Sequence, residues 1–151
     1  MEVRLLLKNA VTHIGVICAL VASSTFAAGQ TSSHGLENRR WRIAKYLANG
    51  SNRGGEKRLI DAAKTAEIAF ENGAIHGSPT CGVLVGPYTL SGNQLTVQPD
   101  FVLNGLCPTE QLAQNQQVLN ALKGDLRVEE KDNQIILREK SGQVRVLLVP
   151  Y

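Results

Sequence analysis

The chain has 151 residues, a formal net charge of +3, and apolar and charged fractions of 43% and 19%. This length suits one domain with a substantial core, and the composition argues against both a disordered chain and a multispan membrane protein. The near-neutral charge balance gives no electrostatic reason to expect binding to nucleic acid or to an anionic membrane.

The first 27 residues have the three-part layout of a secretory signal. Arg4 and Lys8 lie in the opening segment, an apolar run covers residues 10–22, and small residues precede a predicted cleavage site after Ala27. The apolar run is shorter than the roughly 20 residues that a membrane-spanning helix needs. We therefore expect a cleaved signal over residues 1–27, with a retained anchor as the alternative. Cleavage leaves a periplasmic or secreted protein with 14 basic and 12 acidic residues, no stable membrane span and a net charge of +2.

Three cysteines are present, and Cys18 lies within the signal. Cys81 and Cys107 are then the pair that remains in the mature protein, and an oxidising compartment favours a disulfide between them. Two free thiols or a metal site are the alternatives, but a metal site needs more ligands than two cysteines. We predict a Cys81–Cys107 disulfide, no metal site and no cofactor. Closing this loop would stabilise the fold by roughly 3.5 kcal/mol.

The chain after the signal begins with a polar segment. Residues 28–39 contain many Ser, Thr and Gly residues without periodicity, which predicts a flexible leader. The pattern from Arg40 onward predicts a first strand with Trp41 and Ile43 on its core face. The next segment, residues 49–58, contains many Gly, Asn and basic residues and is expected to be a surface loop.

Residues 59–70 fit a helix or a strand equally well by periodicity alone. The following Asn72-Gly73 step is a strong hairpin signal, so we predict a strand over residues 67–70 paired with a strand over residues 74–77. The next stretch, residues 77–108, contains two alternating runs around a Ser-Gly-Asn turn. It is predicted to be a hairpin closed by the disulfide.

The last third of the chain combines one helix with three strands. Pro108, Glu110 and Gly124 are matched boundary signals for a helix over residues 109–123. Alternating segments with turn residues between them predict a meander over residues 126–130, 134–139 and 144–149. Its expected buried face comprises Leu126, Val128, Ile135, Leu137, Val144, Val146 and Leu148, and its expected outer face carries Arg127, Arg138 and Arg145. The elements together predict an α+β domain, mainly antiparallel β, built as a cracked or curled β-barrel with one inserted α-helix.

The order of these features resembles the META domain of HslJ-like heat-shock proteins. The resemblance covers residues 40–151, and its most specific part is F-x-N-G-x-x-x-G, which begins at Phe70 and is followed by Cys81, G-x-Y and Cys107. There are two departures: Gly82 stands where the family usually has Asn, and Leu103-Asn104-Gly105-Leu106 precedes Cys107, where the family usually has a Ser-Thr pair and a Met. The resemblance implies a cracked antiparallel barrel with an inserted helix, an envelope or periplasmic setting, and links to stress tolerance or secretion. It implies no established enzymatic activity.

The sequence contains no G-x-S-x-G, H-E-x-x-H or Gly-rich phosphate-loop motif. His76 is expected to be an exposed strand residue, because no acid or nucleophile is placed to work with it. We therefore expect a monomeric, non-enzymatic protein that binds an unknown protein of the bacterial envelope. The alternative is a carrier of a small apolar ligand within the barrel. An exposed apolar patch would favour the partner-binding protein, and an open apolar cavity would favour the carrier.

Overall fold

A computed structural model describes residues 35–53 and 56–151, with only the backbone described for residues 49–53 and 56–57. The predicted signal, most of the predicted leader and His34 lie outside these residues. The described elements are β1 (Arg40–Arg53), β2 (Glu56–Asp61), β3 (Glu67–Glu71), β4 (Ala74–Ser78), β5 (Val83–Ser91), β6 (Gln94–Val97), β7 (Asp100–Val102), α1 (Thr109–Leu122), β8 (Gly124–Lys131), β9 (Gln134–Arg138) and β10 (Val144–Pro150).

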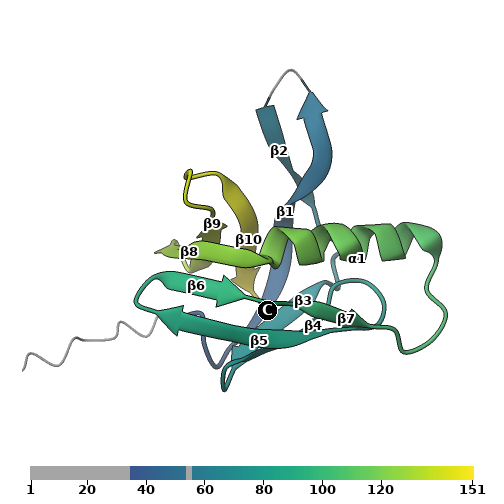
Figure 1. The fold of residues 1–151 in the computed structure, drawn as a ribbon, viewed down its shortest axis with the longest axis horizontal. Helices are drawn as coiled ribbons and strands as arrows, with labels where there is room; N and C mark the ends of the chain where they lie inside the picture. Colours follow the sequence, from purple (N-terminus) through teal and green to yellow (C-terminus); the bar gives the residue numbers. More distant parts are fainter. Residues whose placement is uncertain (1–34, 54–55) are drawn as a thin grey trace, which may run out of the picture.

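The strands form a closed antiparallel barrel, with one helix across it (Figure 1). Neighbouring strands follow the order β1, β3, β4, β5, β6, β8, β9, β10, and pairing of β10 with β1 closes the ring. Strand β2 pairs with the second half of β1, and β7 pairs with β5. The predicted α+β barrel with one inserted helix is confirmed.

Large apolar side chains fill the interior of the barrel. They alternate with outward-facing residues along the strands, as the period of two requires. The largest fully buried side chains are Trp41, Tyr46, Phe70, Leu36, Ile43, Ile68, Ile75, Leu84, Leu95, Leu122, Leu126 and Ile135. Each contributes on the order of 2 kcal/mol through the apolar surface that it removes from water.

The ordered domain begins ahead of the predicted first strand. Leu36 is fully buried, and its backbone carbonyl accepts a hydrogen bond of 2.9 Å from the indole nitrogen of Trp41. The backbone amide of Asn38 donates to the carbonyl of Phe70 at 2.9 Å. The prediction of a flexible leader over residues 28–39 is therefore wrong for residues 35–39, because one apolar residue in a polar segment closes an end of the core.

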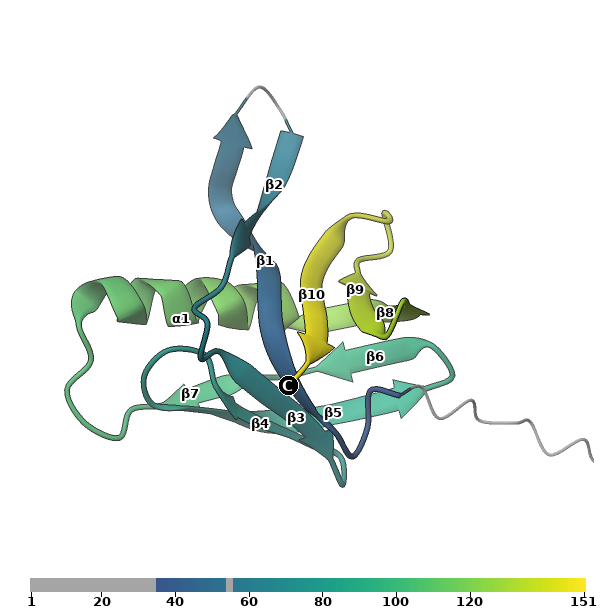
Figure 2. The same ribbon diagram turned by 180° about the vertical axis from the view of Figure 1, so that it is seen from behind.

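The predicted surface loop over residues 49–58 is also wrong. Strand β1 continues to Arg53, β2 begins at Glu56, and these two residues pair at the end of a two-stranded arm that projects from the barrel (Figure 2). The Gly and Asn residues predicted a loop, but the hydrogen bonds of a strand ladder are made by the backbone and form with any side-chain type except proline. The ambiguous residues 59–70 contain the end of β2 and most of β3, and no helix.

The Asn72-Gly73 hairpin is confirmed. Both residues have positive φ angles, 52° and 77°, and Glu71 pairs with Ala74 across the turn. Positive φ at both central positions is the requirement of a type I′ turn, which suits the twist of the two strands. The backbone amide of Tyr88 on β5 donates to the carbonyl of Gly73 at 2.9 Å and ties the turn to the next strand.

Helix α1 ends one residue before the predicted boundary, and the meander differs at one position. Gly124 follows the helix with φ of 100°, which explains why the chain turns there. The pairing of β10 with β9 shifts register between Val144 and Val146. Val146 stays in the core, but Val144 is half-buried and lines a groove on the outer surface. The prediction that Val144 faces the core is wrong, because the bulge changes the alternation.

Candidate functional site

The loop between β7 and α1 carries an exposed apolar surface. Val102, Leu103 and Leu106 are 52%, 53% and 104% exposed, and Tyr151 is the other large hydrophobic residue that is exposed among the described residues. We call residues 102–106 the aliphatic loop. Figure 1 shows it beside the beginning of α1, at the end of the molecule away from β8 and β9. Single exposed apolar residues are common, but three within five positions are typical of an interaction surface.

The two predicted cysteines hold the base of this loop. Cys107 directly follows Leu106, and Cys81 lies between β4 and β5 on the barrel. Their Sγ atoms are 2.24 Å apart, at disulfide distance, and their Cα atoms are 6.0 Å apart. The structure therefore brings together the pair that the sequence singled out. The aliphatic loop is anchored to the barrel at one end by β7 and at the other by this disulfide.

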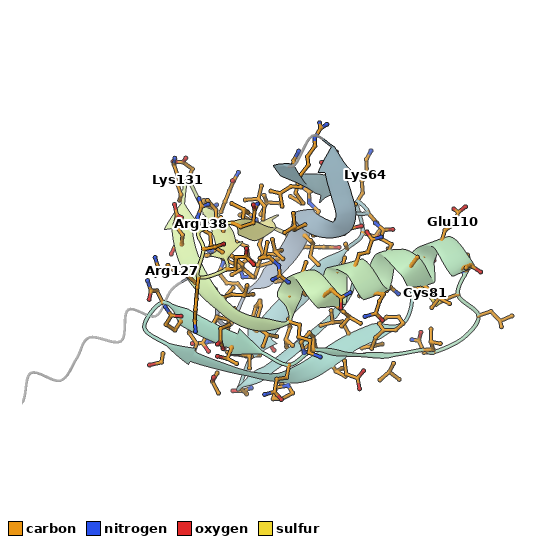
Figure 3. The ribbon with its side chains drawn as sticks, turned by 45° about the horizontal axis from the view of Figure 1, so that its top comes forward. Lys64, Cys81, Glu110, Arg127, Lys131 and Arg138 are labelled. Carbon is orange, nitrogen blue, oxygen red and sulfur yellow. A yellow bond between two sulfur atoms is a disulfide. The ribbon has the colours of Figure 1, made fainter. Side chains whose placement is uncertain are left out.

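Asn115 connects the helix to the cysteine segment. Its side chain is 1% exposed, and it is the buried polar residue of the described chain. Its Nδ2 donates to the backbone carbonyl of Cys81 at 2.8 Å, and its Oδ1 accepts from the hydroxyl of Thr80. Figure 3 shows Cys81 beside α1, where this contact forms. The network fixes the position of α1, and with it the end of the aliphatic loop, relative to the barrel.

Asn115 was not among the predicted site residues, although its position in the helix carries a signal. Asn115 lies three residues after Leu112 and four before Leu119, so it belongs to the apolar face of the helix. A single amide on such a face indicates a buried hydrogen bond, because an unsatisfied polar group in the core is costly. The partner could not be predicted, since it is a backbone carbonyl distant in sequence.

Two carboxylates bracket the aliphatic loop. Asp100 and Glu110 are exposed, and residues 101–109 between them contain no charged side chain. One oxygen of Asp100 accepts a hydrogen bond of 2.7 Å from the amide of Phe101, which fixes its place at the start of the loop. The loop thus carries no charge of its own and lies between two acidic residues in the sequence.

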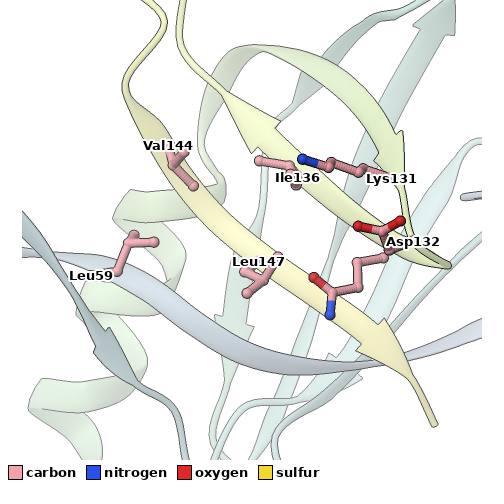
Figure 4. A pocket seen from close by; sticks show the side chains of 7 residues that line it. Leu59, Lys131, Asp132, Ile136, Val144 and Leu147 are labelled. Carbon is pink, nitrogen blue, oxygen red and sulfur yellow. The ribbon is translucent and has the colours of Figure 1, made fainter.

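A groove on the outer surface is a second candidate site. It has a volume of about 320 Å³ and lies between β2 and the outer faces of β9 and β10 (Figure 4). Its lining residues are Leu59, Ile136, Val144, Leu147, Lys131, Asp132 and Gln134. The four aliphatic residues and the three polar residues together give it an amphipathic character. Figure 3 shows Lys131 and Glu110 at opposite ends of the molecule, so the groove is separate from the aliphatic loop.

The titratable residues of the described chain include no metal-binding cluster. Among the residues whose side chains the structure describes, no group of three or more His, Cys, Asp or Glu is arranged to hold a metal ion. His76 is exposed, as predicted, and its Nε2 lies 3.8 Å from a carboxylate oxygen of Glu71. The pKa of Tyr88 is raised to about 12 by burial and by the carboxylate of Glu37, which the Tyr88 hydroxyl contacts.

Within the same ranges, no helix has the length and apolar character needed to span a bilayer.

The comparisons with known proteins identify a family and a fold. The family model described as META domain matches residues 34–149. A protein from Burkholderia xenovorans, solved by NMR, is similar with a TM-score of 0.55 and 12% identity over 77% of this chain and 83% of that chain. A DUF4847 family protein from Bacteroides vulgatus ATCC 8482, solved by crystallography, is similar with a TM-score of 0.51 and 14% identity over 77% of this chain and 94% of that chain. No curated protein sequence matches this chain. At these identities the structural likeness concerns the fold alone.

Proposed function

This chain belongs to the META domain family, and we propose that it is an exported, non-enzymatic protein that binds a partner protein of the bacterial envelope through its aliphatic loop. The observation that carries the proposal is the exposure of Val102, Leu103 and Leu106 on a loop whose base is a disulfide. We place the protein in the periplasm or outside the cell, where a disulfide persists. The resemblance to HslJ-like proteins supports a role in stress tolerance or secretion.

The anchored ends of the loop favour binding. A flexible loop loses conformational freedom when a partner immobilises it, and this loss weakens the complex. Here β7 and the disulfide restrict the loop before the partner arrives. The aliphatic side chains can therefore contribute most of their burial energy to the complex, as anchor residues in protein interfaces do.

The charges around the loop indicate the chemistry of the partner. Asp100 and Glu110 flank the aliphatic side chains, so the complementary surface is an apolar recess with Lys or Arg side chains at its rim. A partner of this kind would associate faster at low ionic strength, since the exposed charges attract each other over a distance that salt shortens. An anionic membrane surface does not fit, because it would repel both carboxylates.

The test replaces the two leucines at the tip of the loop. Photo-crosslinking from position 103 in envelope extracts identifies the partner, and titration of the purified partner then measures affinity. Leu103→Ser and Leu106→Ser should each weaken binding at least about tenfold, since each buried leucine contributes roughly 1.5–3 kcal/mol. Leu147→Ser, in the separate outer groove, is the matched control and should bind like the unchanged protein.

Two results would contradict the proposal. One is equal affinity of the loop variants and the Leu147→Ser control for the crosslinked protein. The other is binding of the unchanged protein to phospholipid vesicles with no specific protein crosslink.

The second candidate function is the carriage of a small apolar ligand. We place this ligand in the outer groove, because the buried side chains occupy the interior of the barrel and the groove offers Leu59, Ile136, Val144 and Leu147. Native mass spectrometry of protein purified from its own envelope should show a bound amphiphile that is lost in Leu147→Asp. The same ligand content in both proteins would rule out this site.

A further inference from the structure

The aliphatic loop contains an Asn-Gly step, Asn104-Gly105, which is a chemically labile residue pair. The chain has three Asn-Gly steps, at positions 49–50, 72–73 and 104–105. Asparagine followed by glycine is chemically labile, because glycine has no Cβ to keep its amide nitrogen away from the asparagine side chain. The reaction also needs a backbone that can bring the two groups together. The structure describes the side chains of Asn72 and Asn104, and their surroundings differ.

Asn104 lies in the middle of the aliphatic loop, outside any strand or helix, and is exposed. Neither its side-chain amide nor the backbone amide of Gly105 is hydrogen-bonded to a described residue. Apart from Gly105 and its chain neighbours Asn104 and Leu106, no heavy atom lies within 4 Å of the position that a Cβ of Gly105 would occupy. Both reacting groups are therefore free to approach each other, although the ends of the loop are fixed.

Asn72 is held in place. Its hairpin turn keeps it at a φ of 52°, and the strands on either side pair directly through Glu71 and Ala74. The carbonyl of Gly73 also accepts the hydrogen bond from Tyr88. Rearranging this turn into a reactive geometry requires local opening of the hairpin, which has a free-energy cost that the aliphatic loop does not have.

We infer that Asn104 is a site of deamidation that converts the aliphatic loop from a neutral to a negatively charged surface. The backbone nitrogen of Gly105 attacks Cγ of Asn104 and forms a new C–N bond. The Cγ–Nδ2 bond breaks, and ammonia leaves with the proton of the Gly105 amide. Water then adds to one of the two carbonyls of the five-membered ring and opens it, which yields aspartate or isoaspartate at position 104.

The product carries a carboxylate between Leu103 and Leu106. A carboxylate loses its hydration when the side chains beside it enter an apolar recess, and this cost opposes docking. Deamidation should therefore weaken the binding of the partner, slowly and irreversibly. This consequence, unlike the reaction itself, rests on the proposed function.

The chemistry is tested by incubating the oxidised mature protein in mildly alkaline buffer and mapping its peptides by mass spectrometry. Asn104 should convert at least about tenfold faster than Asn72, which corresponds to a hairpin-opening cost of about 1.4 kcal/mol or more. Asn104→Gln should reduce the early release of ammonia by the amount that peptide mapping assigns to position 104, and Asn72→Gln should leave the early release unchanged. Equal rates at the two sites, or faster conversion of Asn72, would overturn the inference.

The effect on binding needs a separate measurement. Asn104→Asp should bind the crosslinked partner at least about tenfold more weakly than Asn104→Gln, which has a neutral amide at the same position. Equal affinities of Asn104→Asp and Asn104→Gln for the partner would contradict the inference that deamidation weakens binding. If no partner exists, the proposed function fails, whereas conversion at Asn104 is measured on the purified protein alone.

Discussion

Replacing Asn115 by alanine tests whether α1 is positioned by its contact with the cysteine segment. The change removes the donor to the carbonyl of Cys81 and the acceptor for the hydroxyl of Thr80. The carbonyl would be left unsatisfied, at a cost of about 1–3 kcal/mol. The Thr80 hydroxyl keeps a partner, since it also lies 3.3 Å from the carbonyl of Gln111. Alanine favours the helix by about 0.5 kcal/mol, so we expect a net loss of about 1.5 kcal/mol.

Urea unfolding of the oxidised mature protein measures this loss. The midpoint should fall while the slope stays constant, because the surface exposed on unfolding hardly changes. Gln111→Ala is the control on the same helix. Its side chain is exposed and makes no hydrogen bond to a described residue, so its effect should stay within about 0.5 kcal/mol. Similar small losses for both variants would refute the assignment of a positioning role to Asn115.

Two further predictions concern the barrel. In Gly77→Ala the new Cβ would lie 2.1 Å from the backbone oxygen of Glu67, so unfolding in urea should show a loss of at least about 3 kcal/mol. Gly92→Ala, with no atom within 4 Å of the new Cβ but a φ of 56°, should lose only about 1 kcal/mol, and equal losses would contradict the reasoning. Burial and Glu37 raise the pKa of Tyr88 from 10.0 to about 12. The protonated phenol therefore contributes to the stability of the fold below pH 10, and this contribution is lost as the pH rises toward 12. Absorbance titration should show a phenolate transition near pH 12 that is missing in Tyr88→Phe, and a transition at pH 10 would argue against it.

The parts of the fold that depend on local chemistry could be predicted from the sequence. The Asn72-Gly73 turn requires positive φ angles that few other residue pairs accept, and the helix has its own boundary residues at Pro108 and Gly124. These signals act within a few residues and need no knowledge of the rest of the chain. The barrel class followed from them, because many short strands with turns between them have few ways to bury their apolar faces.

The parts that depend on contacts between distant segments could not be predicted. Leu36 closes the core only because Trp41 and Phe70 lie next to it in space, and nothing in its polar segment indicates this. Val144 moves to the outer surface because of a bulge whose position depends on pairing with β9. The candidate site divides in the same way. Its cysteines could be paired by elimination, whereas the exposure of Leu106 required the folded chain.

Strands β6 and β8 pair directly, although β7, the aliphatic loop and α1 lie between them in the sequence. Gln94 on β6 faces Arg127 on β8, so the chain leaves and re-enters the barrel at neighbouring strands. The register of the ladder is therefore independent of the length of the tip between Leu103 and Leu106, and doubling a loop costs only about 0.6 kcal/mol. Foreign peptides grafted at this tip would be displayed on a rigid base, which makes the domain a natural scaffold for presenting short recognition sequences.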